Sequence, residues 1–295
     1  MTPLTPILFA PTADLARETP VDVTIEAEYG SFVWEGSLFT AAHHQKEGPY
    51  AGRHQGGDQP SPCNNPNIPA LAKGGVIGVS HFDLDTLGGV LRAQGTSSGW
   101  FGASLDSFWQ LAEFVDVNGP HKLDQAKASD EDLERLYAFW AWSAENRFPR
   151  ATEVTDVTDF FAEAEISLAM IFCGGKDLIE AGQAFKKAGE KLNRESFVEC
   201  DGGVIVRVGP AFCNHLYVTP EGTVAKAVAH FNTVTGSVTV SLADPIEGVS
   251  CREIVQALWG PEAGGHDAIA GSPRGVRMGF YSIKAAYEAM QHALG

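Results

Sequence analysis

A short apolar run that leads into a polar turn and then a helix constrains the fold of this chain most strongly. The run VIGVS at 76–80 is β-branched and apolar, which is typical of a strand buried on both faces of a sheet. Polar HFDLD follows it, and TLGGVLRA then has the composition of a helix start. This order predicts a βα unit of a parallel sheet, in which ligand sites lie at the carboxyl ends of the strands.

The length and composition predict a folded protein of two domains. A compact domain usually contains about 100–200 residues, and this chain has 295. Its 17 Phe and 6 Trp are too many for a disordered chain, and 44% apolar residues are enough for a buried core.

The charge excludes some partners. With 21 Lys and Arg against 37 Asp and Glu, the net charge is −16, which disfavours a long nucleic acid and leaves a small anionic substrate open. No apolar stretch is long enough to span a membrane, and the N-terminus lacks a basic secretory region, so no membrane association is expected. The 5 Cys are scattered, which favours free thiols and a cytoplasmic protein; a homodimer is compatible with this sequence.

Three regions differ in pattern, and each predicts a separate part of the fold. Residues 1–73 predict an N-terminal extension, with a β-hairpin at 21–40 and a His-rich loop at 41–69. Residues 74–185 predict a parallel-sheet domain, and residues 198–295 a smaller α/β domain, with the boundary at about 180–198. The helices predicted in the middle of the chain are at 107–117, 129–148, 157–173 and 175–197. In the last domain, strands are predicted at 202–209 and 236–244 and helices at 221–232 and 250–260.

Alternating acidic and imidazole side chains follow the central strand. His81, Asp83 and Asp85 are spaced so that they share one face if the segment is extended. Carboxylates and imidazole suit Mn²⁺, Mg²⁺ or Fe²⁺ better than a soft metal. The alternative is a polar turn in which an Asp caps the following helix.

Other candidate ligands lie further away in the sequence. Asp116 and His121 flank a turn at the end of a helix, where they either add metal ligands or only end the helix. His43 and His44 lie in the long loop, and one of them is a candidate ligand, general base or substrate contact.

A glycine-rich loop near the C-terminus is a candidate anion site. Gly264 and Gly265 are predicted to expose backbone N–H groups before a short helix. His266 and Arg274 would add charge-assisted hydrogen bonds to a phosphate or carboxylate.

Two of these motifs together resemble a known family. VIGVSHFDLDTLGGVL resembles motif I of the DHH phosphoesterase superfamily, and AGGHDAIAG resembles the GGH loop of its associated C-terminal domain. The resemblance implies two α/β domains with a cleft between them. It implies metal binding by His81, Asp83 and Asp85, and substrate binding by Gly264, Gly265 and His266. An Asp-His-His triplet is absent, and Asp116 with His121 is its nearest counterpart; His43 or His44 could replace missing ligands.

The function predicted on this basis is metal-dependent hydrolysis. His81, Asp83, Asp85, Asp116 and His121 would hold the ion, with Mn²⁺ favoured and Mg²⁺, Fe²⁺ or Zn²⁺ as alternatives. The candidate catalytic residues are Asp83, His121, His43 and His44. The substrate would be a phosphoester of a small nucleotide, a short oligonucleotide or a similar anion, attacked by water that the metal activates. The alternatives are hydrolysis of an amide or other C–N bond in a small molecule, and a catalytically silent DHH-like binding protein.

Overall fold

The structure of the protein is a computed structural model that describes residues 5–45, 47–102, 105–273 and 275–295. Two compact units make up the chain, Met1–Phe185 and Lys186–Gly295. Both contain a sheet with parallel strand pairs together with helices, so the protein is of the α/β class that the sequence predicts.

A five-stranded sheet forms the centre of the first unit. Its strand order is β5-β2-β6-β1-β7, in which the first four strands are parallel and β7 is antiparallel to β1. The strands are β1 Ile7–Phe9, β2 Val23–Ile25, β5 Phe39–Ala41, β6 Ile77–Val79 and β7 Thr155–Asp156. The strand predicted at 76–80 is therefore present as β6, and all three of its residues are buried.

The N-terminal residues belong to this sheet, which corrects two expectations. Residues 1–73 supply three of its strands and so do not form a separate extension. The predicted hairpin at 21–40 is reduced to its tip, β3 Glu28–Tyr29 with β4 Phe32–Val33. The segments on either side of that tip form β2 and β5, which are neighbours but run parallel. Alternation in the sequence shows that a segment is extended, but it does not give the direction in which strands pair.

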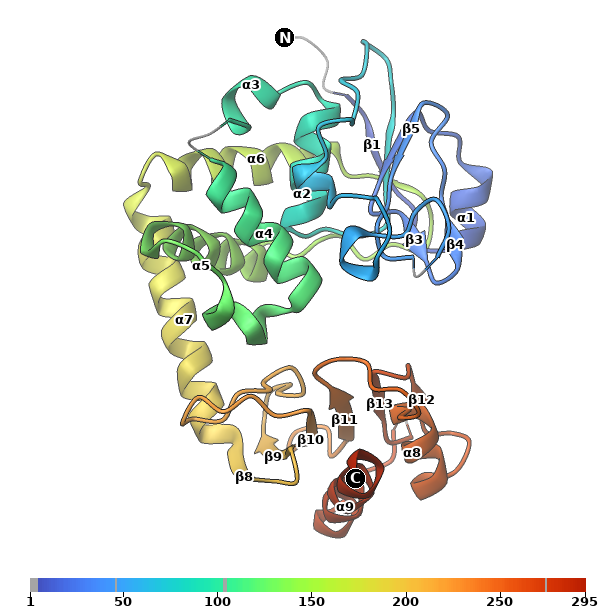
Figure 1. The fold of residues 1–295 in the computed structure, drawn as a ribbon, viewed down its shortest axis with the longest axis vertical. Helices are drawn as coiled ribbons and strands as arrows, with labels where there is room; N and C mark the ends of the chain where they lie inside the picture. Colours follow the sequence, from blue (N-terminus) through green and yellow to red (C-terminus); the bar gives the residue numbers. More distant parts are fainter. Residues whose placement is uncertain (1–4, 46, 103–104, 274) are drawn as a thin grey trace. The chain divides into compact units, whose positions relative to one another are not determined.

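Helices cover both faces of the sheet. Figure 1 shows α2 (Leu84–Ala93), α4 (Asp106–Asn118) and α6 (Thr158–Phe172) on one side and α1 (Ala13–Glu18) on the other. The remaining helical segments of the first unit are η1 Arg53–Gln55, η2 Pro62–Asn64, α3 Ser97–Trp100, η3 Pro120–Gln125, α5 Asp130–Glu145 and the first half of α7 Lys176–Ser196. The four helices predicted between 107 and 197 are thus present as α4, α5, α6 and α7, with bounds that differ from the predicted ones by three residues at most.

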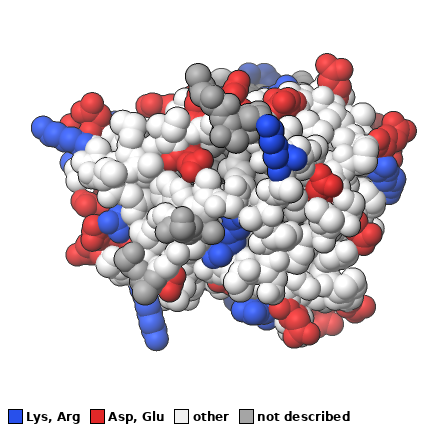
Figure 2. Space-filling model, turned by 90° about the horizontal axis from the view of Figure 1, so that it is seen from above, with Lys and Arg blue, Asp and Glu red and all other residues white. Residues whose placement is uncertain are grey.

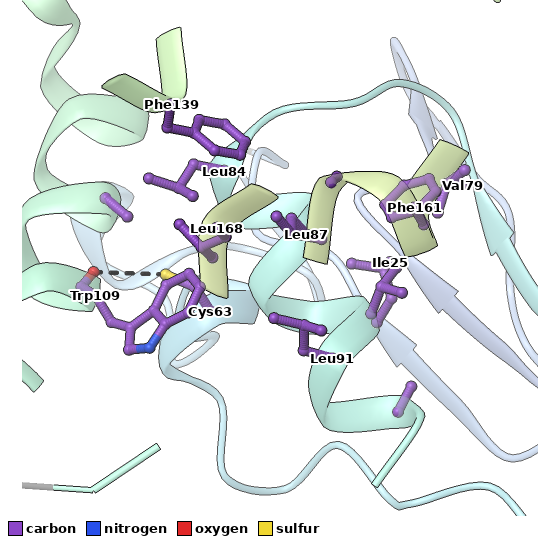
Figure 3. Packing of buried hydrophobic residues seen from close by; sticks show 14 of the residues in the cluster. Ile25, Cys63, Val79, Leu84, Leu87, Leu91, Trp109, Phe139, Phe161 and Leu168 are labelled. Carbon is purple, nitrogen blue, oxygen red and sulfur yellow. Dashed lines mark hydrogen bonds between the residues drawn. The ribbon is translucent and has the colours of Figure 1, made fainter. Parts of the chain in front are cut away.

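Helix α2 packs closely against the loop that contains η2. Figure 3 shows Leu87 and Leu91 of α2 among the buried side chains, with the Cys63 thiol donating to the Trp109 carbonyl at 3.6 Å. A Cβ at Gly88 would lie 2.5 Å from Cys63 Cβ. Gly88 therefore serves close packing between α2 and η2.

The second unit has a six-stranded sheet of order β12-β13-β11-β10-β9-β8, in which only the pair β9–β10 is parallel. Helices α8 and α9 pack on the buried side chains of its sheet. The elements are β8 Phe197–Asp201, β9 Val204–Gly209, β10 Ala227–Asn232, β11 Val238–Leu242, α8 Cys251–Trp259, β12 Gly264–Gly265, β13 Ile269–Gly271 and α9 Phe280–Leu294.

Two predictions for this unit are wrong. The helix predicted at 221–232 is strand β10, which is buried on both faces and so lacks the alternation that identifies a strand. The short helix expected after Gly264 and Gly265 is strand β13, which pairs antiparallel with β12. Between them, the N–H of His266 donates to the carbonyl of Ile269 at 2.7 Å, as in a tight hairpin.

Every helix in the described ranges is too short or too polar to cross a bilayer. On the face drawn in Figure 2, Lys and Arg side chains are interspersed with Asp and Glu.

Substitution of Gly88 by Ala should destabilise the first unit. The new methyl group would lie 2.5 Å from Cys63 Cβ and 2.8 Å from Cys63 Cα, so backbone has to move, and overpacking of this kind costs about 1–3 kcal/mol. The control is Gly189→Ala in α7, where nothing lies within 4 Å and alanine favours the helix. Urea unfolding measures both, and equal stabilities for the two variants would contradict this packing.

The buried His230 on β10 should make the second unit sensitive to acid. Burial, together with the nearby Arg207 and His215, lowers its pKa from 6.5 to about 4, and the backbone of Ala211 opposes this shift. The unfolded chain thus takes up this proton at a higher pH than the folded chain does. The contribution of neutral His230 to the free energy of unfolding is therefore fully present above about pH 6.5. It falls by up to about 3 kcal/mol towards pH 4.

His230→Gln tests this because the amide does not titrate. Unfolding of the variant, followed by urea titration at several pH values, should depend less on pH between 4 and 6.5 than unfolding of the unsubstituted protein. An unchanged pH dependence would show that other groups cause the acid sensitivity.

Candidate metal centre

The candidate site lies at the carboxyl edge of the parallel sheet in the first unit. The register aligns Ile25 of β2 with Ala41 of β5 and with Val79 of β6, so these strands end at the same level. Glu26 follows β2 directly, and His43 lies two residues beyond β5. The sheet thus brings together residues that are 17 positions apart in the sequence.

Glu26 has a backbone conformation that is uncommon for a residue with a side chain. Its φ is 51°, in the left-handed region. Its N–H donates to the Ala41 carbonyl at 2.9 Å, and its own carbonyl accepts from the Ser80 hydroxyl. These bonds hold the strained residue so that its carboxylate is fully buried, and strain of this kind is often found at functional sites.

The His43 imidazole lies at the centre of three carboxylates. Its Nε2 is 3.1 Å from Glu26 Oε1, 3.4 Å from Asp85 Oδ2 and 3.2 Å from Asp116 Oδ2. The adjacent His44 places its Nε2 2.8 Å from Glu26 Oε2 and 3.8 Å from Asp116 Oδ1. One imidazole nitrogen can donate only one proton, so it cannot satisfy three carboxylates by hydrogen bonding.

Two helices deliver the other carboxylates. Asp85 is in the first turn of α2, and its Oδ1 accepts from the backbone N–H of Cys63 at 2.8 Å, which leaves Oδ2 towards His43. Asp116 is in the last turn of α4, a long way from Asp85 in sequence. Packing of α2 and α4 in one core is what brings these two carboxylates together.

The ligand atoms lie close enough together that they could hold a divalent cation. Glu26, His43 and His44 form one set, and His43, Asp85 and Asp116 a second set, in each of which the ligand atoms all lie within 4.8 Å of one another. Both carboxylate oxygens of Glu26, one of Asp85, one of Asp116 and Nε2 of His43 are buried without a hydrogen-bond partner. Buried carboxylates are costly unless enough positive charge faces them, and here two imidazoles face three carboxylates. Oxygen ligands with imidazole suit Mn²⁺.

The clustered carboxylates and imidazoles shift one another's pKa values. Burial alone would raise the pKa of Glu26, but the neighbouring His43 and His44 imidazoles outweigh it and lower that pKa. Burial would lower the pKa of His43, and the surrounding carboxylates raise it instead. Burial raises the pKa of Asp85, opposed by His43 and assisted by the nearby negative charges. The site therefore has more negative charge than its own imidazoles compensate.

One side of the cluster is accessible. The side chains of Glu26 and Asp85 are 0% exposed, whereas Asp116 is 13% and His44 38% exposed. A metal centre that binds water or a substrate needs an open side, which a purely structural centre does not. Asp116 and His44 mark that side here.

Three of the predicted metal ligands, His81, Asp83 and His121, lie outside the two ligand sets. His81 and Asp83 face each other, with Nε2 3.2 Å from Oδ2, and neither belongs to the two ligand sets. Asp83 Oδ1 caps α2 by accepting from the N–H of Thr86 at 2.7 Å. Helix α2 begins at Leu84, so residues 81–85 are not extended throughout, although the spacing of His81, Asp83 and Asp85 puts them on one face only in an extended segment. Asp83 and Asp85 are therefore directed apart.

The other predicted site residues are placed as follows. His121 is in η3, outside the two ligand sets. Gly264, Gly265 and His266 form the exposed hairpin of β12 and β13 in the second unit. Arg274 lies outside the described residues.

Glu26 is the residue that sequence reasoning missed. The alternation of VDVTIEAEYG assigns Glu26 to a strand, in which a Glu is expected on the solvent side. The signal that could have identified it is its position directly after a β-branched strand. Ser80 and then His81 follow strand β6 in the same way.

Comparisons with known proteins give no family. No family model matches the chain, and no curated protein matches it significantly. A crystal structure of an uncharacterized protein from Helicobacter pylori G27 is similar at 11% identity, over 75% of this chain and 75% of that chain. Its TM-score of 0.23 is too low to support a conclusion about the fold.

Two adjacent carboxylates should differ in their effect on metal binding. Asp85→Asn should weaken Mn²⁺ binding by more than about 100-fold, since loss of an outer-shell partner alone costs about 10–100-fold. Asp83→Asn should bind Mn²⁺ almost as the unsubstituted protein does, because Asn caps a helix as well as Asp. Isothermal titration calorimetry measures both, and equal losses would place Asp83 among the ligands.

Proposed function

We propose that this protein is a metal-dependent hydrolase with a divalent ion, preferably Mn²⁺, at the carboxyl edge of its first sheet. The observation that carries the proposal is the convergence of three buried carboxylates on His43 Nε2, with oxygen atoms that lack hydrogen-bond partners. Glu26, His43, Asp85 and Asp116 would hold the ion, with His44 at the accessible side. Mg²⁺, Fe²⁺ and Zn²⁺ are the alternatives.

A divalent ion bound there would lower the pKa of a water molecule from 15.7 towards about 7 and would polarise the bond to be broken. Residues of the chain would position this ion and shield it from bulk water. Glu26, His43 and Asp85 are buried, so bulk water does not reach these ligands. His44 is half exposed and keeps its Nε2 at Glu26 Oε2, so it supplies a polar group at the accessible side. The proposed catalytic roles of Asp83 and His121 depend on the family resemblance alone.

The proposed substrate is a small phosphoester, and its support is the resemblance to the DHH superfamily. The strand, polar turn and helix that carry motif I are present as β6, residues 80–83 and α2. The exposed hairpin of Gly264, Gly265 and His266 in the second unit is proposed, from the same resemblance, as an anion-binding segment. The free thiols of the chain agree with the proposed cytoplasmic location.

One experiment separates the proposed functions. The Mn²⁺-loaded protein should hydrolyse a p-nitrophenyl phosphodiester, lose this activity with a chelator, and lose at least about tenfold with Asp116→Asn. The control is Glu113→Gln on the same helix, which removes the same charge from a carboxylate bound to the Asn64 amide and should retain activity.

The other outcomes identify the alternatives. Cleavage of a p-nitroanilide and not of the phosphodiester would favour hydrolysis of a C–N bond. Failure to retain Mn²⁺ through dialysis would contradict the metal centre and favour a binding protein without catalytic activity.

A further inference from the structure

We infer that Glu28 is a positioning residue for the metal centre, which it serves by fixing the backbone of His43 and His44. The inference depends on the proposed metal site. Glu28 is on β3, two residues beyond the strained Glu26, and it is half-buried. It is not in either set of ligand residues.

The contacts of Glu28 are directed at the histidine pair. Its Oε2 accepts from the backbone N–H of His43 at 3.2 Å and from that of His44 at 3.2 Å. Its Oε1 accepts from the side-chain amide of Gln45 at 2.9 Å. One carboxylate thus binds three consecutive residues of the loop. Two successive N–H groups that converge on one anionic oxygen form an anion-binding arrangement of the backbone.

This arrangement fixes the direction of both imidazoles. Because the two N–H groups point to the same oxygen, the chain cannot turn at His43 without breaking one of the bonds. With the backbone held, the Nε2 atoms of His43 and His44 lie 3.1 Å and 2.8 Å from the two oxygens of Glu26. The hairpin tip β3–β4 therefore holds the backbone of the two histidines through the carboxylate of Glu28.

The backbone turn at Glu26 also contributes to the position of Glu28. Glu26 has to adopt a left-handed backbone conformation, and this turn directs the chain from β2 into β3. After this turn, the Glu26 carboxylate lies in the ligand cluster and the Glu28 carboxylate lies at the backbone N–H groups of the histidines. Outer-shell groups that orient ligands typically change metal affinity by about 10–100-fold when removed.

The test compares substitutions of Glu28 in the full-length protein. Glu28→Ala should weaken Mn²⁺ binding by about 10–100-fold in calorimetry. It should also reduce the ¹⁴N modulation of bound Mn²⁺ in pulsed electron paramagnetic resonance, because the imidazoles are no longer held. Glu28→Gln keeps an accepting oxygen for the two N–H groups and should restore most of the affinity. The thermal unfolding temperature in EDTA reports any loss of fold separately.

The matched control is Glu35→Ala, which removes a carboxylate that accepts from the Tyr50 hydroxyl at 2.8 Å in the same region. It should bind Mn²⁺ as the unsubstituted protein does. If the unsubstituted protein and Glu28→Ala bind Mn²⁺ equally, the inference is wrong and the proposed metal site stands. If the unsubstituted protein does not bind Mn²⁺, both are wrong. An equal loss with Glu28→Gln would show that charge, and not positioning, is the contribution of Glu28.

Discussion

The first unit depends on the burial of three carboxylates at one edge of its sheet. Glu26 and Asp85 are completely buried, Asp116 is partly buried, and their oxygens converge on a single imidazole nitrogen. Such a group is unfavourable unless something compensates its charge, because desolvation of each carboxylate costs several kcal/mol. The proposed cation would supply that compensation, so metal binding and the stability of this edge are expected to be linked.

The surrounding structure holds these groups in place at some cost. Glu26 has a strained backbone, held by Ala41 and Ser80. Asp85 is held by the N–H of Cys63, which requires that α2 approach η2 as closely as Gly88 allows. Strain and close packing at the same edge are typical of a site whose geometry matters more than local stability.

Local pattern gave much of the fold. The strand at 76–80, the four long helices between 107 and 197 and the helix at 250–260 were predicted because their periodicity is strong. Strand pairing could not be obtained in this way. The alternation of 21–40 suggested a hairpin, but its two halves are parallel neighbours, and the helix predicted at 221–232 is a strand buried on both faces. The site was predicted in part: Asp85, Asp116, His43 and His44 were candidates, and Glu26 was not.

The sequence by itself determined the class of the fold, the polar turn after the central strand and the candidate ligand types, because these depend on neighbouring residues and their periodicity. Only the tertiary structure decided which of those residues meet. Asp83 and Asp85 are two positions apart and are directed apart by the start of α2. Glu26, His43 and Asp116 are far apart in sequence, and they are brought together by strand register and by the packing of α4. Contacts of this kind are set by the pairing of whole elements, and no local pattern contains that information.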